Sequence, residues 1–513
     1  MISRSLRFIL AVFLILSAPA ESADKIDGYT IGRITIVRNN IFDLSKPEES
    51  GAIGRWGNRL HIITRDKVIR LELLFKEGDP FNADLIEESE RNLRKFDFLT
   101  DVRIKPVPNH ETRTVDVFVS TRDQWSLIIG GTFGGTSENA QTGLDLGEKN
   151  LLGEGISLSY TLRHDNGGDT SSYGFRDTTF LDTRYTLDIA HKVLPDEKNY
   201  IFLLEKPFYS IDTKTAHGIT HNQRNHDGGN QVFDSLRTNA YYGVSFPFKK
   251  KHIIRARAIV SLGEQKVRQA DNSLLIDRDN KAGVSVEFLF DPRKYNKATY
   301  IEKFRQVEDI AMGRRITLTL APRLKSLGSS TSDVFAVVRV TRNYLIGERD
   351  YLFTLVELRR NDDSFNKQFA DFDVRYYMRW FEYQTILYHI QVSYSESETN
   401  RFMLGGTNGV RGYKVDEFSG KNQLVLNVED RIFTYVSMFS GLIEPGFVVF
   451  ADFGNTWNDE TGDKLTELHG GAGVGLRLAL LKAPGISLIR VDYGYSLDMT
   501  RSPIVTFGME GFF

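Results

Sequence analysis

The chain has 513 residues, a formal net charge of −2 and no cysteine. This balance leaves no basic stripe, which argues against nucleic acid as a partner, and the lack of cysteine excludes disulfides, thiolate metal sites and a cysteine nucleophile. The mean hydropathy is negative. Outside the N-terminus no apolar run approaches the ~20 residues of a membrane helix, whereas a membrane barrel, apolar only at every second strand position, stays compatible.

The first 20 residues have the pattern of a secretory signal peptide. Arg4 and Arg7 form a positive region, Phe8–Leu16 an apolar core, and Ala18-Pro19-Ala20 a small-residue cleavage site. An uncleaved anchor helix is the less favoured alternative, because the apolar run is too short to span a bilayer. The pattern predicts export, and 12% aromatic residues with 43 glycines are typical of a bacterial outer-membrane barrel.

Residues 28–122 are predicted to form a small domain of the order β-α-α-β-β. Alternation and helix-capping residues give its elements: a strand at Thr30–Val37, helices beginning after Thr64 and Asn82, and strands at Val102–Ile104 and Val115–Val119. An irregular insert at residues 42–59, with no assigned role, separates the first strand from the first helix.

This domain resembles a POTRA domain, the periplasmic module of outer-membrane assembly and secretion proteins. The matching residues are Val68-Ile-Arg70, Phe75-Lys-Glu-Gly-Asp79, Leu93 with Phe96, and the strand Val115–Val119. The resemblance implies that a strand edge receives an extended segment of a client protein, through backbone groups that make little demand on sequence. The alternative is a rigid spacer that binds nothing.

From Trp125 to Phe513 the dominant period is two. Alternation is clear at Ile156–Arg163, Gly471–Leu480 and Ile489–Leu497, where an apolar row opposes a row of polar residues and glycine. Short connections alternate with longer polar ones, as on the two rims of an outer-membrane barrel. The prediction for residues 125–513 is therefore a transmembrane antiparallel β-barrel with an apolar outside and a hydrated interior.

The number of strands is less well determined. Ten strands are expected from Arg315 onward, and between six and ten from Trp125 to Met312, because Pro207, Pro247 and Pro292 mark either turns or interruptions. Sixteen strands fit the length, and 18 or 20 are also compatible with the pattern.

A glycine-rich loop, residues 405–418, carries a single arginine, Arg411. On the following strands, alternation predicts that Asn427, Glu429, Arg431 and Asp452 point into the lumen, and Gly454 leaves room beside Asp452. A guanidinium group binds a carboxylate in bidentate fashion, so Arg411 is predicted to latch the loop to the wall through Glu429 and Asp452. An exposed loop arginine is the alternative.

Four motifs in order resemble the BamA/TamA barrel superfamily. They are Gly143–Gly155, the loop motif Val410-Arg-Gly-Tyr413 with Gly412, Asn427–Arg431, and Phe450–Gly454. With the POTRA-like domain, the resemblance covers nearly the whole mature chain. It implies an outer-membrane barrel whose loop contact supports folding or activity.

The C-terminus resembles the address by which the assembly machinery inserts barrels. Phe507, Met509 and the terminal Phe513 alternate, although Gly511 stands where an apolar residue is usual. Gly130–Gly135 and Gly508–Gly511 together suggest that the first and last strands form a weakly packed seam.

Other motifs predict no chemistry. His217, His221 and His226 have metal-like spacing but lie in a polar stretch, and the glycine runs 130–135 and 470–475 do not lead into a helix as a phosphate loop does. No Ser-His-Asp arrangement stands out, so the sequence predicts neither an enzyme nor a cofactor.

The sequence therefore predicts a protein that inserts, assembles or translocates other proteins at the bacterial outer membrane. Its expected partners are outer-membrane lipid, client proteins that present a strand, and periplasmic accessory proteins. The alternatives are a dedicated secretion pore, a lipid-transport barrel and a passive porin-like channel.

Overall fold

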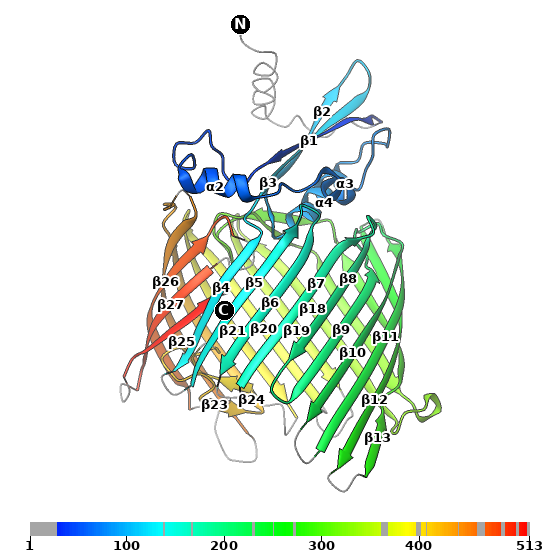
Figure 1. Ribbon diagram of the computed structural model, residues 1–513, viewed down its shortest axis with the longest axis vertical. Coiled ribbons are helices and arrows are strands. Elements are labelled where there is room, and N and C mark those ends of the chain that lie inside the picture. Colours follow the sequence, from blue (N-terminus) through cyan, green and yellow to red (C-terminus); the bar gives the residue numbers. More distant parts are fainter. Residues whose placement is uncertain are drawn as a thin grey trace.

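The computed structural model describes residues 28–136, 139–165, 168–227, 231–249, 251–269, 273–360, 368–396, 402–406, 408–439, 441–458, 467–483, 488–498 and 502–509. The predicted signal peptide and the terminal Phe513 lie outside these residues. Figure 1 shows a small mixed domain, in blue, above one end of a wide ring of strands.

The small domain is a three-stranded sheet covered by helices. Its elements are β1 (Thr30–Asn39), α2 (Ala52–Leu60), α3 (Asp66–Glu72), α4 (Ala83–Arg94), β2 (Leu99–Asn109) and β3 (Thr114–Asp123). Strand β3 lies in the centre, parallel to β1 and antiparallel to β2. Alternate residues of β3, Val115, Val117 and Val119, are buried in one apolar core with Leu93 of α4. The two-residue period of the strand and the helical period of α4 thus meet in this core.

The helix starts agree in part with the sequence. Asn82 caps α4, and its side-chain oxygen accepts a hydrogen bond from the N–H of Asp84 at 2.9 Å. The predicted cap Thr64 is wrong: its N–H and hydroxyl both donate to Asp123 Oδ2, and α3 begins after Arg65. None of the helices in the described part of the chain is both long and apolar enough to cross a membrane.

The insert, predicted to be irregular, contains the helix α2. Its buried residues are Gly54 and Gly57. A methyl group on Gly57 would lie 2.6 Å from the Phe42 ring, so the helix packs through its glycines. Glycine is a poor helix former, which is why the pattern did not reveal this element.

The second part of the chain is a ring of antiparallel strands. Its strands are β4 (Leu127–Thr136), β5 (Asn139–Leu151), β6 (Ile156–Asp165), β7 (Gly168–Phe180), β8 (Tyr185–Val193), β9 (Glu197–Lys206), β10 (Thr215–Asp227), β11 (Gln231–Phe248), β12 (His252–Gln269), β13 (Leu274–Arg278), β14 (Lys281–Phe290), β17 (Arg314–Arg323), β18 (Asp333–Ile346), β19 (Asp350–Arg360), β20 (Gln368–Phe381), β21 (Gln384–Ser395), β24 (Asn422–Phe433), β25 (Ile443–Trp457), β26 (His469–Leu480), β27 (Leu488–Ser496) and β28 (Ile504–Met509). A 3₁₀ turn, η2 (Lys325–Leu327), precedes β18. The strand order is closed, with β28 beside β4.

The ring holds more strands than the sixteen predicted. Within the described residues, β13 and β14 pair with successive parts of β12, so the closed order has twenty strand positions. Ten of these lie in the part that begins at Arg314, as expected. The first part also has ten, the upper end of the expected six to ten, so the total equals the largest number that the pattern left open. Pro247 lies inside β11 and marks no turn. Pro207 and Pro292 do follow strand ends.

The two faces of the wall differ as the alternation predicted. On β24, Asn427, Glu429 and Arg431 are buried, whereas Val428 and Ile432 are exposed. Apolar side chains thus cover the outside of the ring and charged ones face its interior, which is the arrangement of a membrane barrel.

The small domain rests on the rim that carries short turns. Asn150 Nδ2 donates to Thr64 Oγ1 at 2.8 Å, and the N–H of Arg65 donates to the Gly153 carbonyl at 2.8 Å. The N–H of Trp125 donates to the Lys482 carbonyl at 2.6 Å. These bonds fix the domain to the turns after β5 and β26.

Candidate functional site

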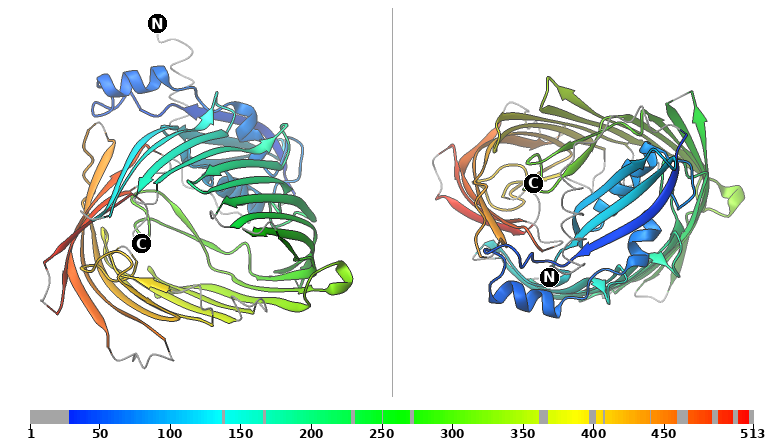
Figure 2. Two further views of the ribbon diagram at one scale, coloured as in Figure 1. Left: turned by 60° about the horizontal axis from the view of Figure 1, so that its bottom comes forward. Right: turned by 90° about the horizontal axis from the view of Figure 1, so that it is seen from above.

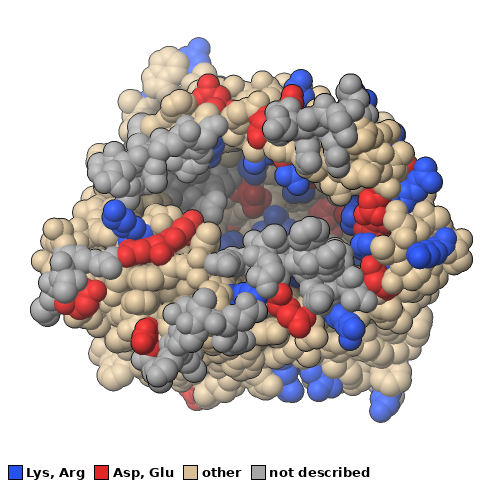
Figure 3. All heavy atoms as spheres, turned by 90° about the horizontal axis from the view of Figure 1, so that it is seen from below, with Lys and Arg blue, Asp and Glu red and all other residues tan. Residues whose placement is uncertain are grey.

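The glycine-rich loop, residues 405–418, folds back inside the ring at the end opposite the small domain. It joins β22 (Phe402–Leu404) to β23 (Phe418–Gly420), which pair as a separate two-stranded sheet. Val410 and Tyr413 of the loop are buried against Leu404 and the β24 residue Val425. Figure 3, seen from this end, shows charged side chains in the hollow of the barrel.

Arg411 meets both predicted acidic residues. Its Nε and Nη2 donate to the two carboxylate oxygens of Asp452 at 2.7 and 2.8 Å, and its Nη1 donates to Glu429 Oε1 at 2.6 Å. The guanidinium group also lies over the Phe450 ring, 3.6 Å from its centroid. Arg411 is 7% exposed and both carboxylates are fully buried. Bidentate binding in such a site fixes the position of the loop as well as contributing energy.

Further charges surround this pair. Arg431 Nε donates to Glu429 Oε2 at 2.8 Å, Arg477 Nη1 donates to Asp492 Oδ1 at 2.6 Å, and Asp492 Oδ2 lies 4.0 Å from Arg411. Each of the three guanidinium groups of Arg411, Arg431 and Arg477 thus pairs with a buried carboxylate. We call this group the lumenal charge cluster; its members are Arg411, Glu429, Arg431, Asp452, Arg477 and Asp492.

Glycines let the loop lie directly on the wall. Gly412 has a φ of +92°, a conformation that side chains disfavour. A methyl group on Gly471 would overlap the carbonyl oxygen of Arg411, and one on Gly494 would lie 2.7 Å from the backbone nitrogen of Gly412. The loop can therefore lie this close to the wall only because both carry glycines, which have no side chain, where they meet.

The remaining loop-motif residues also contact the wall. A methyl group on Gly454 would lie 2.9 Å from Val410 Cγ2, so Gly454 leaves room for Val410 and not only for Asp452. The hydroxyl of Tyr413 donates to the Gly470 carbonyl at 3.1 Å.

A second segment enters the lumen from the other end. Residues 291–313, the connection between β14 and β17, contain the pair β15 (Tyr295–Ala298) and β16 (Glu308–Ala311); we call this connection the lumenal segment. Its Tyr300 and Phe304 pack against inward-facing residues of the wall, among them Phe433. The carbonyl of Ile301 accepts a hydrogen bond from Arg431 Nη1 at 3.0 Å. The lumenal segment therefore shares Arg431 with the lumenal charge cluster.

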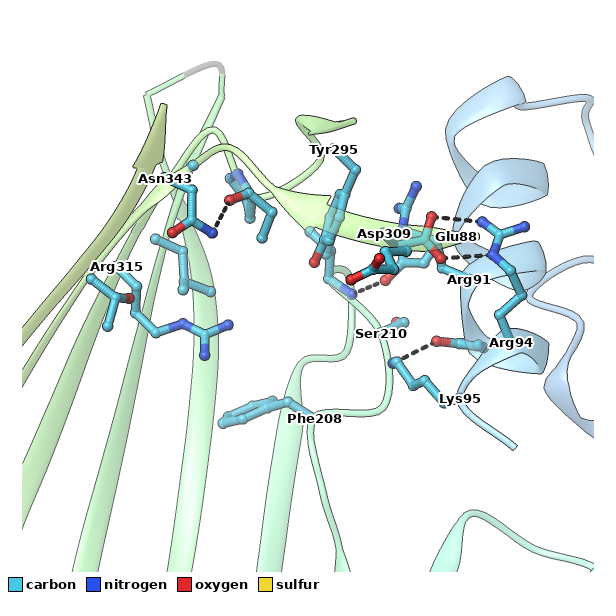
Figure 4. Close-up of a pocket in the computed structure, with 18 of the residues that line it drawn as sticks. Glu88, Arg91, Arg94, Lys95, Phe208, Ser210, Tyr295, Asp309, Arg315 and Asn343 are labelled. Atoms are coloured by element: carbon cyan, nitrogen blue, oxygen red, sulfur yellow. Dashed lines mark hydrogen bonds and ion pairs between the residues drawn. The ribbon is translucent and has the colours of Figure 1, made fainter. Parts of the chain in front are cut away.

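The lumenal segment also contacts the small domain, through α4. Arg94 donates from Nε and Nη2 to the two oxygens of Asp309, both at 2.7 Å, and Lys297 Nζ donates to Glu90 Oε1 at 2.7 Å. Figure 4 shows α4 facing the lumenal segment across a cavity of about 640 Å³. Ion pairs thus join the small domain to the same segment that touches the charge cluster.

Glu88 of α4 binds the barrel rim and not the lumenal segment. Burial raises its pKa, and the hydrogen bond from the Ile211 N–H, at 2.6 Å, opposes this increase. Ile211 lies in the turn between β9 and β10, so α4 bridges the barrel rim and the lumenal segment.

The other residues singled out in the sequence do not join this site. His217 and His221 share one face of β10, and His226 lies on the other because strand residues alternate. No group of three or more metal-type ligands is found among the residues that the structure describes. Phe507 and Met509 lie in β28, and Phe513 lies outside the described residues.

Sequence reasoning missed two parts of the site. It placed Arg431 on the lumenal face but gave it no partner, because the carbonyl that it binds belongs to the lumenal segment. That segment has strands of only four residues, and these were too short to give a periodic signal. Arg477 and Asp492 lie on the polar faces of two segments in which alternation was clear, Gly471–Leu480 and Ile489–Leu497. This alternation was the signal available for the wider cluster.

Comparisons with known proteins agree with this architecture. Residues 351–506 match the Omp85 superfamily domain, and residues 57–122 match POTRA, described as a surface antigen variable number repeat. The chain is 28% identical over 141 residues to a Treponema pallidum (strain Nichols) protein that bears the provisional name outer membrane protein assembly factor. It is 24% identical over 216 residues to the outer membrane protein assembly factor BamA of Buchnera aphidicola subsp. Acyrthosiphon pisum (strain APS).

These matches cover 26% and 38% of this chain, and only 17% and 33% of the two relatives. Among solved structures, CdiB from Escherichia coli aligns at 12% identity over 93% of this chain and 76% of its own, with a TM-score of 0.44. BamA from Haemophilus ducreyi lacking POTRA domains 1–3 aligns at 12% identity over 93% of this chain and 83% of its own, with a TM-score of 0.38.

Replacing Arg411 with alanine is expected to release the loop while leaving a barrel that inserts. Removing one side of a buried ion pair costs about 3–5 kcal/mol, because the partner carboxylates stay buried without compensation. Limited proteolysis at the loop and the temperature of the heat-dependent gel shift measure this loss. Arg411→Lys, which keeps the charge but not the bidentate geometry, is expected to be intermediate.

The matched control is Arg224→Ala, which breaks an ion pair with Glu197 in which the arginine side chain is 60% exposed. Such a pair contributes at most about 1 kcal/mol. Equal protease resistance of the two alanine variants would reject a latching role for Arg411.

Gly471→Ala tests the same contact without removing a charge. The new methyl group would overlap the Arg411 carbonyl, and overpacking of this kind costs about 1–3 kcal/mol. We expect loop cleavage to approach that of Arg411→Ala. The control Gly147→Ala adds a methyl 3.1 Å from the Leu158 carbonyl oxygen, a smaller overlap, on β5, which pairs with β4 and β6 and not with the strands that hold the loop. Loop cleavage in this control should stay near the wild-type level. A resistant loop in the Gly471 variant would contradict the packing argument.

Arg94→Ala is expected to free α4 from the lumenal segment. The variant leaves Asp309 without its bidentate partner, so hydrogen exchange should rise in residues 295–311 and in α4. Arg70→Ala, which removes an ion pair with Asp66 on the surface of α3, is the control. Exchange confined to α4 in the Arg94 variant would show that the two parts move independently.

Proposed function

We propose that this chain, which carries a POTRA domain followed by an Omp85 superfamily domain, inserts or translocates other proteins at the bacterial outer membrane. Its barrel lies in that membrane and its POTRA domain in the periplasm. The proposal follows the names of the relatives, which are outer membrane protein assembly factors, and it extends their activity to a chain that matches only part of each.

The observation that carries the proposal is the occupied lumen beneath a docked POTRA domain. The loop at residues 405–418 is bound to the wall at one end, and the lumenal segment fills space at the other. Helix α4 is bound to that segment by ion pairs. A passive pore needs an open path, whereas these contacts favour a barrel whose movements are linked to its periplasmic domain.

Of the two edges of the POTRA sheet, β1 is the better place for a client strand. The edge strand β2 contains Pro106 and Pro108, which have no N–H, and its Ile104 N–H already donates to Glu90 Oε2 at 2.8 Å. Prolines at an edge block strand addition. The other edge, β1, has no proline in Thr30–Asn39. Its first residues already bind residues 77–81, because the Ile31 N–H donates to the Asp79 carbonyl at 2.7 Å and the Ile34 N–H donates to Glu77 Oε1 at 2.8 Å. The stretch of β1 that follows, residues 35–39, is therefore the proposed edge. A client strand would extend the sheet along β1 by backbone hydrogen bonds.

The join between β4 and β28 is proposed as the place where the barrel opens. Within the described residues β28 pairs with β27 over six positions, whereas β11 and β12 pair over eighteen. The described part of β28 can therefore offer β4 only a few backbone hydrogen bonds. Opening there would expose strand edges onto which a client strand can pair.

A disulfide across this join is expected to abolish activity. Outward-facing Leu127 or Ile129 of β4 would be changed to cysteine together with Val505 or Phe507 of β28, and the pair that oxidises would be used. Because the natural chain has no cysteine, no other disulfide competes. Assembly of client barrels is compared before and after reduction.

The control is a disulfide between Val428 and Ala451, which are paired on β24 and β25. It should leave activity unchanged. Full activity of the oxidised β4–β28 form would eliminate the opening, and loss of specific outer-membrane proteins on depletion of the chain would identify its clients. Depletion that altered lipid distribution without loss of any protein would instead favour lipid transport.

A further inference from the structure

Helix α2 turns its apolar face away from the protein. Ile53, Trp56 and Leu60, at i, i+3 and i+7, share one side of the helix and are 48%, 60% and 70% exposed. The side that packs on the domain carries Gly54 and Gly57. A helix on a water-exposed surface normally packs its apolar face against the protein and turns its polar face outward. The outward apolar face of α2 therefore indicates an apolar environment outside the protein.

The contacts of α2 fix this orientation. Asn58 donates from Nδ2 to the Phe42 carbonyl at 2.8 Å and accepts from the Phe42 N–H at 3.0 Å. A methyl group on Gly57 would lie 3.1 Å from the ring of Trp125, the residue that leads into the barrel. The helix is therefore pinned to the start of the barrel with its large apolar residues outward.

The exposed face is continuous with the outer surface of the barrel. Leu60 and Ile62 line a groove of about 200 Å³ together with Leu127 of β4 and Leu152 of the turn after β5. Ile129, further along β4, is 72% exposed on the same outward face as Leu127. Figure 2 shows α2 outside the ring of strands, beside the rim. One apolar surface thus runs from the lipid-facing wall onto the helix.

The charged and aromatic residues of α2 also suit a lipid surface. Arg55 and Arg59, four residues apart, lie together along one side of the apolar face. The Arg59 guanidinium lies 5.7 Å from the centre of the Trp56 ring, and Arg55 Nη1 donates to the Ser50 carbonyl at 2.5 Å. Tryptophan beside arginine at the edge of an apolar face is the composition of helices that lie in a membrane interface, where arginines meet phosphate groups.

We propose that α2 is an interfacial helix that lies in the periplasmic leaflet of the membrane beside β4, with Ile53, Trp56 and Leu60 among the acyl chains and Arg55 and Arg59 at the phospholipid phosphates. The role rests on the membrane location of the barrel but not on its activity. It gives the insert a function: to hold the POTRA domain against the membrane next to the join between β4 and β28.

Single nitroxide labels test this placement. Trp56→Cys and Leu60→Cys are labelled in the full chain, which has no cysteine of its own, and reconstituted in vesicles of phosphatidylethanolamine and phosphatidylglycerol. Power saturation then compares access to oxygen, which concentrates in lipid, with access to a water-soluble nickel chelate. Both labels are expected to favour oxygen several-fold.

Two further labels separate the possible failures. The label at Ile129→Cys, on the outside of the wall, should be more accessible to oxygen, as expected in lipid. The label at Glu48→Cys, on the exposed part of the insert, should be more accessible to the nickel chelate, as expected in water. If the label at Ile129 favours oxygen while those at positions 56 and 60 favour the nickel chelate, as at Glu48, then α2 does not lie in the membrane interface, although the barrel lies in the membrane. Labels at 56 and 60 shielded from both reagents would mean that protein covers the helix, which would also overturn the proposal.

Discussion

The balance of charge inside the barrel is the constraint on which the rest of the structure depends. An isolated ion is costly to bury, so each member of the lumenal charge cluster is tolerable only while the others are in place. Arg411 comes from the loop, Glu429 and Arg431 from β24, and Asp452 from β25. The loop therefore cannot leave without stranding carboxylates in the wall, and the wall cannot rearrange without releasing the loop.

Arg431 extends this constraint toward the periplasm. One of its nitrogens donates to Glu429 and another to the Ile301 carbonyl, and the lumenal segment that contains Ile301 also presents Asp309 to Arg94 of α4. A continuous series of charged and hydrogen-bonded contacts thus joins the loop at one end of the barrel to the POTRA domain at the other. The lumenal segment therefore contacts both α4 and Arg431, which supports Glu429.

Alternation along the strands was enough to predict the barrel, its two faces and the meeting of Arg411 with Glu429 and Asp452. These features depend on local periodicity and on a polar face that must be satisfied. The lumenal segment and α2 could not be predicted in the same way. The first is fixed by contacts with residues more than a hundred positions away, such as Arg431, and the second by glycines that pack on Phe42. Alternation also left open whether Pro247 marks a turn, and it lies inside β11 near the end of the strand, paired with Ile253.

The strands of the wall are not all held together equally strongly, because the lumenal charge cluster lies on only some of them. Strands β24 to β27 carry the lumenal charge cluster, so separating them would break buried ion pairs as well as backbone bonds, each unsatisfied backbone group costing several kcal/mol in lipid. The join between β4 and the six-residue β28 lies just beyond this arc. The POTRA domain is joined to the barrel through Trp125, which lies immediately before β4 and next to Gly57 of α2. The proposed opening between β4 and β28 therefore lies outside the arc of buried ion pairs and next to the point where the chain passes from the POTRA domain into the barrel.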